Sequence, residues 1–144
     1  WFCNFTVSQN LNRQSTMNEE MRYIELKTGF NDNGPAWIGK VQFSKSGRTI
    51  YFNGKAFKSL DGRGTFSNYY DLETNDEYWI SGIKKNGQDR HWAGGGQIMI
   101  DCNVISEYLE LTNFETLNKS NFKPVDILPI DKNRFAEIEN EKIK

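Results

Sequence analysis

The chain has 144 residues, which is the size of one domain and enough to enclose one hydrophobic core. Its hydrophobic content of 37% is low for a globular protein, but 14% of its residues are aromatic. Because aromatic side chains each bury a large area, a few of them can build a compact β core. The formal net charge of -1 excludes a strong overall attraction to nucleic acid or to anionic lipid.

Several classes of protein are disfavoured by the sequence. The longest apolar runs fall far short of the roughly 20 residues that a membrane span needs, and the start Trp1-Phe2-Cys3 does not resemble a signal peptide. Cys3 and Cys102 lie far apart, without a Cys-x-x-Cys motif, so a metal site is disfavoured. The two thiols can form one disulfide, but the spacing does not require it. We therefore expect a cytoplasmic protein without a cofactor, without a metal and without a membrane segment.

The chain divides into three parts. Residues 1–20 form a polar N-terminal arm that is either loose or not native to the domain. Residues 21–130 form a single β-rich domain, with a helix near residues 103–113. Residues 131–144 form a charged C-terminal tail or a frayed helix.

Alternation of apolar and polar residues predicts a series of short strands after the arm. They cover residues 22–28, 36–44, 48–53, 55–60 and 65–72. Turn-forming sequences separate them, and Asn53-Gly54 is the clearest hairpin signal because both residues tolerate a positive φ. Strands that recur about every 8 to 12 residues are typical of an antiparallel barrel or sandwich.

Residues 77–101 are predicted to form one strand-turn-strand unit. Glu77–Ile83 is the first strand, and Lys85-Asn86-Gly87-Gln88 reads as a type I′ turn. The return strand starts at Asp89–Trp92, is interrupted by three glycines at 94–96, and resumes at Gln97–Asp101. Such a glycine run in a sheet indicates a bulge, a sharp bend or a close approach by another chain or ligand.

The pattern becomes helical after Asp101. Asn103 is a candidate N-cap and Asn113 a candidate stop for a helix with the apolar stripe Val104, Ile105, Tyr108, Leu109 and Thr112. Beyond it, Pro124 and Pro129 limit regular structure, and an edge strand is expected around Val125, Ile127 and Leu128.

These patterns predict a mainly β fold. We expect a small, strongly bent antiparallel barrel, Src homology 3-like or of a related type, with one short C-terminal helix. The alternative is an α+β fold with an antiparallel sheet.

His91 is the first candidate for chemistry, because histidine suits proton transfer near neutral pH. Asp89 shares its face of the predicted strand and can orient its ring. More commonly, a histidine at a strand end bonds to a backbone carbonyl or stacks on a neighbour such as Trp92. No nucleophile motif or phosphate loop accompanies the pair. We therefore assign no catalytic residue, and His91 with Asp89 are weak candidates for a small enzyme.

A binding surface is the better candidate, because basic residues alternate with aromatic ones. Such a surface can hold single-stranded nucleic acid or a protein partner. Opposite charges also commonly pair across neighbouring strands, which would remove some of these residues from the surface. The candidate binding residues are Lys40, Arg48, Tyr51, Lys55, Tyr69, Tyr70, Lys84, Lys85, Arg90 and Trp92.

The predicted function is a non-enzymatic binding module with a protein or single-stranded nucleic-acid partner, in an oligomeric state that the sequence leaves open. One alternative is the small enzyme with His91 and Asp89. Another is an immunity-type or phage-derived inhibitor protein, which is favoured only by small size and by the lack of catalytic motifs.

A resemblance covers roughly Met21 to Asp126. The runs MRYIELKTGF, GPAWIGKVQFSKSGRTIYFNGKAF, NYYDLET and EYWISGIKKNGQDRHWAGGGQIMID resemble a group of small, stand-alone bacterial proteins of unknown function. Some of these carry the name deoxyxylulose-phosphate synthase. That thiamine-diphosphate enzyme needs Gly-Asp-Gly followed by Asn, whereas this chain has only Asp61-Gly62-Arg63. The resemblance therefore implies no catalytic residue, and it places residues 1–20 outside the common domain.

Overall fold

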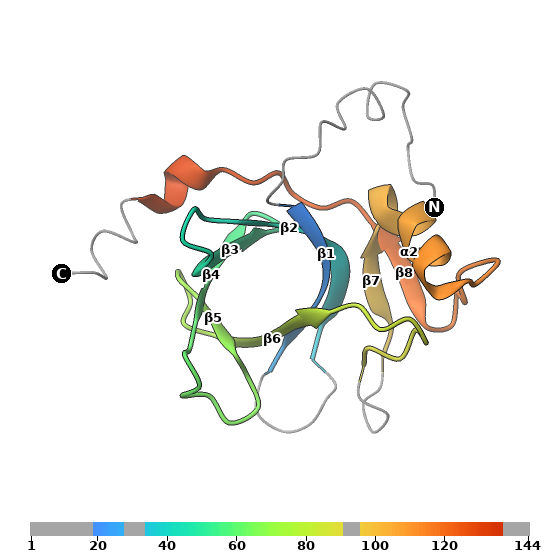
Figure 1. Ribbon diagram of the computed structural model, residues 1–144, viewed down its shortest axis with the longest axis horizontal. Coiled ribbons are helices and arrows are strands. Elements are labelled where there is room, and N and C mark those ends of the chain that lie inside the picture. The colour runs from blue at the N-terminus through green and yellow to red at the C-terminus, as the bar shows by residue number, and fades with distance from the viewer. Residues whose placement is uncertain (1–18, 28–33, 91–95, 137–144) are drawn as a thin grey trace.

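The computed structural model describes residues 19–27, 34–90 and 96–136 (Figure 1). Within these residues, eight strands belong to one sheet, and a 3-10 helix and an α-helix follow the seventh strand. The elements are β1 (Glu19–Leu26), β2 (Ala36–Phe43), β3 (Thr49–Phe52), β4 (Lys55–Ser59), β5 (Tyr69–Asp71), β6 (Glu77–Gly82), β7 (Ile98–Asp101), η1 (Cys102–Val104), α2 (Ile105–Thr112) and β8 (Phe122–Val125).

Strands β1 to β6 close into a six-stranded antiparallel barrel, which Figure 1 shows along its axis. Closure occurs because β1 pairs with β6 on one edge and with β2 on the other. The side chains that alternate inward along these strands fill the barrel: Ile24, Val41, Ile50, Phe52, Phe57, Tyr78 and Ile80. The predicted mainly β fold, a small antiparallel barrel with one short helix after it, is confirmed.

Strand β2 pairs with three other strands. One of its edges pairs with β1 along almost its whole length. On the other edge, its first residues pair in parallel with β7, from Ala36 opposite Ile98 to Ile38 opposite Ile100. Its last two residues, Gln42 and Phe43, pair with β3. The sheet therefore branches at β2, and β7 and β8 lie outside the barrel (Figure 1).

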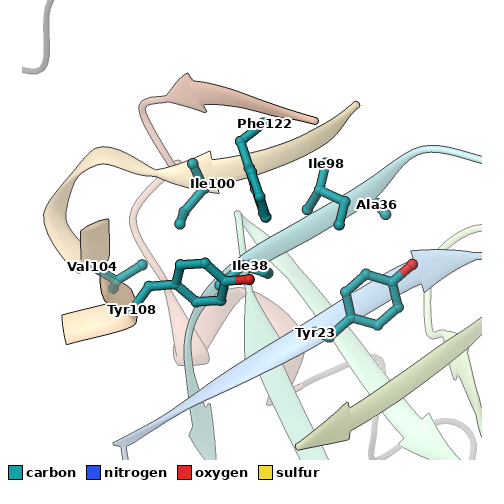
Figure 2. Close-up of a cluster of buried hydrophobic side chains, with 8 residues drawn as sticks. All are labelled: Tyr23, Ala36, Ile38, Ile98, Ile100, Val104, Tyr108 and Phe122. Atoms are coloured by element: carbon teal, nitrogen blue, oxygen red, sulfur yellow. The ribbon is translucent and has the colours of Figure 1, made fainter. Parts of the chain in front are cut away.

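A second hydrophobic cluster fills the space between the barrel and this branch. Figure 2 shows Tyr23 of β1 and Ile38 of β2 facing side chains from the branch and from α2. The cluster consists of Tyr23, Ala36, Ile38, Ile98, Ile100, Val104, Tyr108 and Phe122. The sequence pattern predicts a half-buried β2, but here both faces of β1 and β2 are largely buried, since the branch covers their outer side.

A third cluster lies on the outer side of β3 and β4. Residues 132–136 are helical, and Phe135 is fully buried with its ring centroid 6.1 Å from that of Tyr51. Ala56 and Leu72 complete the cluster. The described part of the predicted tail is therefore a short helical segment that packs on the barrel.

The predicted strand-turn-strand unit over residues 77–101 is wrong. Strand β6 ends at Gly82 and does not pair with β7, which runs parallel to β2 and β8. The apolar pair Ile98 and Ile100 packs in the second cluster, outside the barrel, so the chain has to cross from the barrel to the branch. Asp89 and Arg90 are not in a strand. His91, Trp92, Gly94 and Gly95 lie outside the described residues, and Gly96 has a φ of 91°.

The turn before that crossing also differs from the prediction. Gly87 N–H donates to Lys84 O at 3.1 Å, so the turn spans 84–87, one residue earlier than predicted. Of Asn86 and Gly87, only Gly87 has a positive φ, of 74°, so the turn is not of type I′. In contrast, Asn53 and Gly54 have φ values of 53° and 73°, and they form the predicted two-residue hairpin turn.

The C-terminal elements agree with the prediction in part. Asn113 ends α2 with a φ of 61°, as expected. The predicted N-cap Asn103 does not cap it: α2 follows Val104, which makes no capping bond, and Asp101 caps the preceding η1 by accepting from Asn103 N–H at 3.0 Å. The edge strand is β8, and it ends before the predicted Ile127 and Leu128. Ile127 packs against the barrel interior instead, and Leu128 is exposed.

Strand β8 contains Pro124, which has no N–H group. Phe122 N–H donates to Asn118 O at 3.0 Å, and Ile98 N–H of the neighbouring β7 donates to Asn121 O at 2.8 Å. On the edge of β8 that faces away from β7, few backbone N–H groups are therefore free to donate.

In the described part of the chain, no helix has the length and apolar character needed to cross a membrane.

Cys102, at the start of η1, is buried and disulfide-bonded. The other cysteine of the chain, Cys3, lies outside the described residues. The disulfide therefore anchors the end of β7, and with it the branch of the sheet.

Removing this bond should destabilise the protein, because the unfolded chain gains conformational freedom. We expect Cys102→Ser to lower the free energy of unfolding by about 2–5 kcal/mol. Chemical denaturation with and without a thiol reductant measures this loss, and wild type in reductant should match the variant. Equal stability of wild type with and without reductant would contradict a structural role for the bond.

Gly39 in β2 leaves room for the Phe52 ring inside the barrel, since a Cβ at this position would lie 2.6 Å from Cε1 of Phe52. We expect Gly39→Ala to destabilise the fold by about 1–3 kcal/mol, because the buried Phe52 ring has to move. Gly82→Ala is the matched control, as its Cβ would meet only Arg22 Nη1 at 3.7 Å. Urea denaturation should show a lower midpoint for the first variant alone; equal midpoints would mean that the barrel accommodates the methyl group.

Candidate functional site

The structure separates nine of the ten predicted binding residues into three regions. Lys40, Tyr51 and Lys55 lie on the barrel wall under or beside the covering elements. Arg48, Tyr69 and Tyr70 lie near the barrel end where β3 and β5 begin and β4 ends. Lys84, Lys85 and Arg90 lie on the crossing between β6 and β7, and Trp92 is outside the described residues. No single surface contains them all.

The wall residues stabilise the fold. Lys40 Nζ lies 2.8 Å from Glu107 of α2, and Lys55 Nζ lies 3.3 Å from the buried carboxylate of Asp71. The pairing of the basic and acidic segments across strands, considered in the sequence, thus occurs for Lys55. Tyr51 is only 5% exposed beneath Phe135, so its ring offers almost no surface to a partner.

The two tyrosines of β5 face opposite ways. Tyr69 packs against the barrel interior, and burial raises the pKa of its hydroxyl, while the nearby Arg22 acts in the opposite direction. The guanidinium of Arg22 lies 5.7 Å from the ring centroid of Phe43, which closes this end of the barrel. Tyr70 packs against the third cluster and lies opposite Lys58 of β4.

A buried polar network lies in the seam between β1 and the crossing segment. Tyr23 OH donates to Glu25 Oε1, and Lys27 Nζ lies 2.8 Å from Glu25 Oε2. Glu25 is 2% exposed, so this pairing offsets the cost of burying its charge. Burial, followed by the bond to Glu25, raises the pKa of Tyr23 far above its ordinary value. The outward face of β1 is therefore structural here.

Asp89, the candidate partner of His91, also lies in this seam. Its Oδ1 accepts from Lys84 N–H at 2.7 Å, which fixes the turn, and its Oδ2 is buried without a hydrogen-bond partner among the described residues. Burial raises the pKa of Asp89, and the Lys84 backbone bond partly opposes this. The hydroxyl of Tyr108 is likewise buried and unpartnered there. Asp89 thus has a positional role, and His91 lies outside the described residues.

In the described part of the chain, no group of three or more His, Cys, Asp or Glu side chains is placed to hold a metal ion.

Phe66 is an exposed aromatic residue that the sequence did not single out. Among the described residues it is the most exposed large apolar side chain, at 76%. Its segment is predicted as part of a strand over 65–72, but β5 begins only at Tyr69, and residues 60–68 form a loop. Phe66 is surrounded in the sequence by turn-forming residues, namely Gly62, Gly64, Thr65, Ser67 and Asn68. These residues were the available signal for a loop at this position.

The loop is held firmly. Leu60 N–H donates to Asn68 O at 2.9 Å, and Arg63 N–H and Nε donate to Leu60 O at 3.0 and 2.9 Å. A Cβ at Gly64 would lie 2.3 Å from Ser67 O, so only glycine fits there. A large apolar side chain on such a fixed backbone loses little entropy on binding, which suits it to be an anchor.

The loop is also tied to β6 on both sides of Trp79. Ser67 bonds to Glu77, and the side chain of Asn68 bonds to both backbone groups of Ile80, at 2.7 and 2.8 Å. Trp79 itself is 39% exposed and alternates outward. Figure 1 shows α2, β7 and β8 beside β1 and β2, and the C-terminal helical segment beside β3 and β4, whereas no described element covers the β5–β6 side.

We call the surface formed by Phe66, Trp79 and the neighbouring cations Lys45, Arg48, Lys58 and Arg63 the rim surface. It joins the β2–β3 turn, the 60–68 loop and the outer side of β6. Arg48 O accepts from Ser59 N–H at 3.3 Å, so the β2–β3 turn lies beside the end of β4, where the 60–68 loop begins. Of the predicted binding residues, Arg48 belongs to this surface.

Comparison with protein-family models, with curated proteins and with solved structures gives no match.

The buried charge of Asp89 should make stability depend on pH. Its folded pKa is raised, so its contribution to stability is fully present below the unfolded value and is lost as pH rises through the folded value. Asp89→Asn keeps an acceptor for Lys84 N–H but carries no charge. We expect a higher free energy of unfolding than wild type at pH 7, and a smaller difference at pH 4, by urea denaturation. A variant less stable than wild type at pH 7 would contradict this.

Proposed function

We propose that the protein is a non-enzymatic binding module that engages a protein partner through the rim surface, with Phe66 as the anchor. The exposed Phe66 on its fixed loop is the observation that carries the proposal. Aromatic and arginine side chains are the usual anchors of protein interfaces. Arg63 lies on the same loop as Phe66, and Ser67 and Asn68 of this loop bond to β6 on both sides of Trp79.

A protein partner is favoured over nucleic acid by the charge of the chain. Domains that bind nucleic acid are usually strongly basic, whereas this chain has a sequence pI of 5.9. Of the described aromatic rings predicted for base stacking, Tyr51 is buried and Tyr69 packs inward, so these two offer no platform for bases.

An enzyme acting through His91 and Asp89 is the less supported alternative. Asp89 faces the seam, and its Oδ1 is engaged by Lys84 N–H. An inhibitor of the immunity or phage-derived type is one form that a protein-binding module can take, and the rim surface is the face that we assign to it.

The compartment in which the module acts is also a proposal. The sequence predicts the cytoplasm, whereas the disulfide-bonded Cys102 supports an oxidising compartment, because structural disulfides are rare in reducing ones.

Site-specific photocrosslinking tests the proposal directly. Benzoylphenylalanine placed at position 66 should crosslink to one protein in an extract of the source cells, and the adduct should survive nuclease but not protease. The matched control carries the crosslinker at position 128, since Leu128 is 62% exposed but lies beside the Asn53-Gly54 turn. An adduct from position 128 but not from 66, or a nuclease-sensitive adduct, would count against the proposal.

A further inference from the structure

Several cations of the described residues meet a carboxylate. These pairs are Arg22 with Glu20, Lys27 with Glu25, Lys40 with Glu107, Lys55 with Asp71 and Arg134 with Glu73. The last pair is bidentate, at 2.7 and 2.6 Å. These cations are already neutralised within the fold.

The four cations of the rim surface have no such partner. Lys45, Arg48, Lys58 and Arg63 form no ion pair with any described residue, and all but Lys58 are exposed. Lys84, Lys85 and Lys123 are unpaired as well, but they lie on the β6–β7 crossing and on β8, apart from the rim.

The rim cations lie close together because of the strand register. Thr49 pairs with Lys58, and Arg48 accepts from Ser59 N–H, so the side chains of Arg48 and Lys58 come from adjacent strands at the same barrel end. Arg63 follows on the loop. The nearby carboxylates are Asp61 on the same loop and Glu77 of β6, whose side chain bonds to Ser67. The four cations therefore outnumber two carboxylates, and an excess of exposed charge of one sign attracts the opposite sign.

Phe66 indicates which chemical group, besides negative charge, a molecule bound at the rim surface has to carry. Its loop also carries Arg63, whose backbone N–H and Nε both bond to Leu60 O, so the charged and the apolar side chain have fixed backbone positions. An occupant that matches both carries carboxylates for Arg48 and Arg63 and an apolar side chain for Phe66.

We infer that the partner presents an acidic peptide segment with at least one apolar side chain to the rim surface. This inference rests on the proposed function and adds the chemistry of the partner. Carboxylates bind the guanidinium groups of Arg48 and Arg63, and the apolar side chain packs on Phe66, so affinity should decrease with salt.

Selection from a random dodecapeptide library on the folded, full-length chain tests the inference. We expect enriched peptides to contain an excess of Asp and Glu together with an apolar residue. Arg48→Glu with Arg63→Glu should lower the affinity of these peptides by roughly tenfold or more, with a smaller loss at about 300 mM than at about 50 mM salt. Lys119→Glu with Lys123→Glu is the charge-matched control, since both lysines are exposed and lie near β8, and it should change affinity less than about twofold.

Phe66→Ala separates this inference from the proposed function. If Phe66→Ala loses binding while Arg48→Glu with Arg63→Glu keeps it, the surface is right and the acidic occupant is wrong. If neither variant changes the affinity of selected peptides, the rim surface itself is wrong. Selection of peptides without an acidic excess, failure of any peptide to enrich, or tighter binding of single-stranded oligothymidylate than of the peptides each overturns the inference. All variants replace exposed side chains, and thermal unfolding checks that they are folded.

Discussion

The rest of the structure depends on the shared pairing of β2. Its one edge belongs to β1, and its other edge is divided between β7 at the start and β3 at the end. Because the barrel closes through β1 and β2, the branch at β2 has to lie over their outer face. This arrangement buries both sides of two strands, and it brings Tyr23 and Glu25, which a simple barrel would expose to solvent, into a covered seam.

Burial of that seam decides how the polar residues are used. Glu25 is held by Tyr23 and Lys27, and Asp89 fixes the backbone of the crossing, so the residues that suggest chemistry in the sequence mainly hold two layers together. Among the described residues, the opposite side of the barrel has no such layer (Figure 1). There Arg48 and Arg63 form no ion pair with a described residue, and Phe66 projects from a fixed loop. The described exposed aromatic and unpaired basic side chains of the rim surface thus lie away from the covered seam.

The sequence predicts the local structure better than the long-range pairing. The alternation of apolar and polar residues locates all the barrel strands. Asn53-Gly54 predicts the β3–β4 turn and Asn113 predicts the end of α2, because these residues tolerate the positive φ found at each position. The parallel pairing of β7 with β2 depends on contacts between Ile98 and Ile100 and residues of β2 about 60 positions earlier in the sequence. Local sequence patterns do not encode such long-range contacts. The same limit applies to the surface, since alternation cannot tell that Phe135 covers Tyr51 or that Lys40 meets Glu107. Phe66 is missed because an aromatic residue next to Tyr69 and Tyr70 resembles the start of a strand.

A closed barrel has no free edges, so β8 is the place where the described sheet ends. Its Pro124 has no N–H, and the N–H of Phe122 is already bonded to Asn118. An additional strand from another molecule would therefore find acceptors there but hardly any donors. The one free edge of the described sheet is therefore poorly suited to accept a further strand, because a strand pairs through donors and acceptors in alternation.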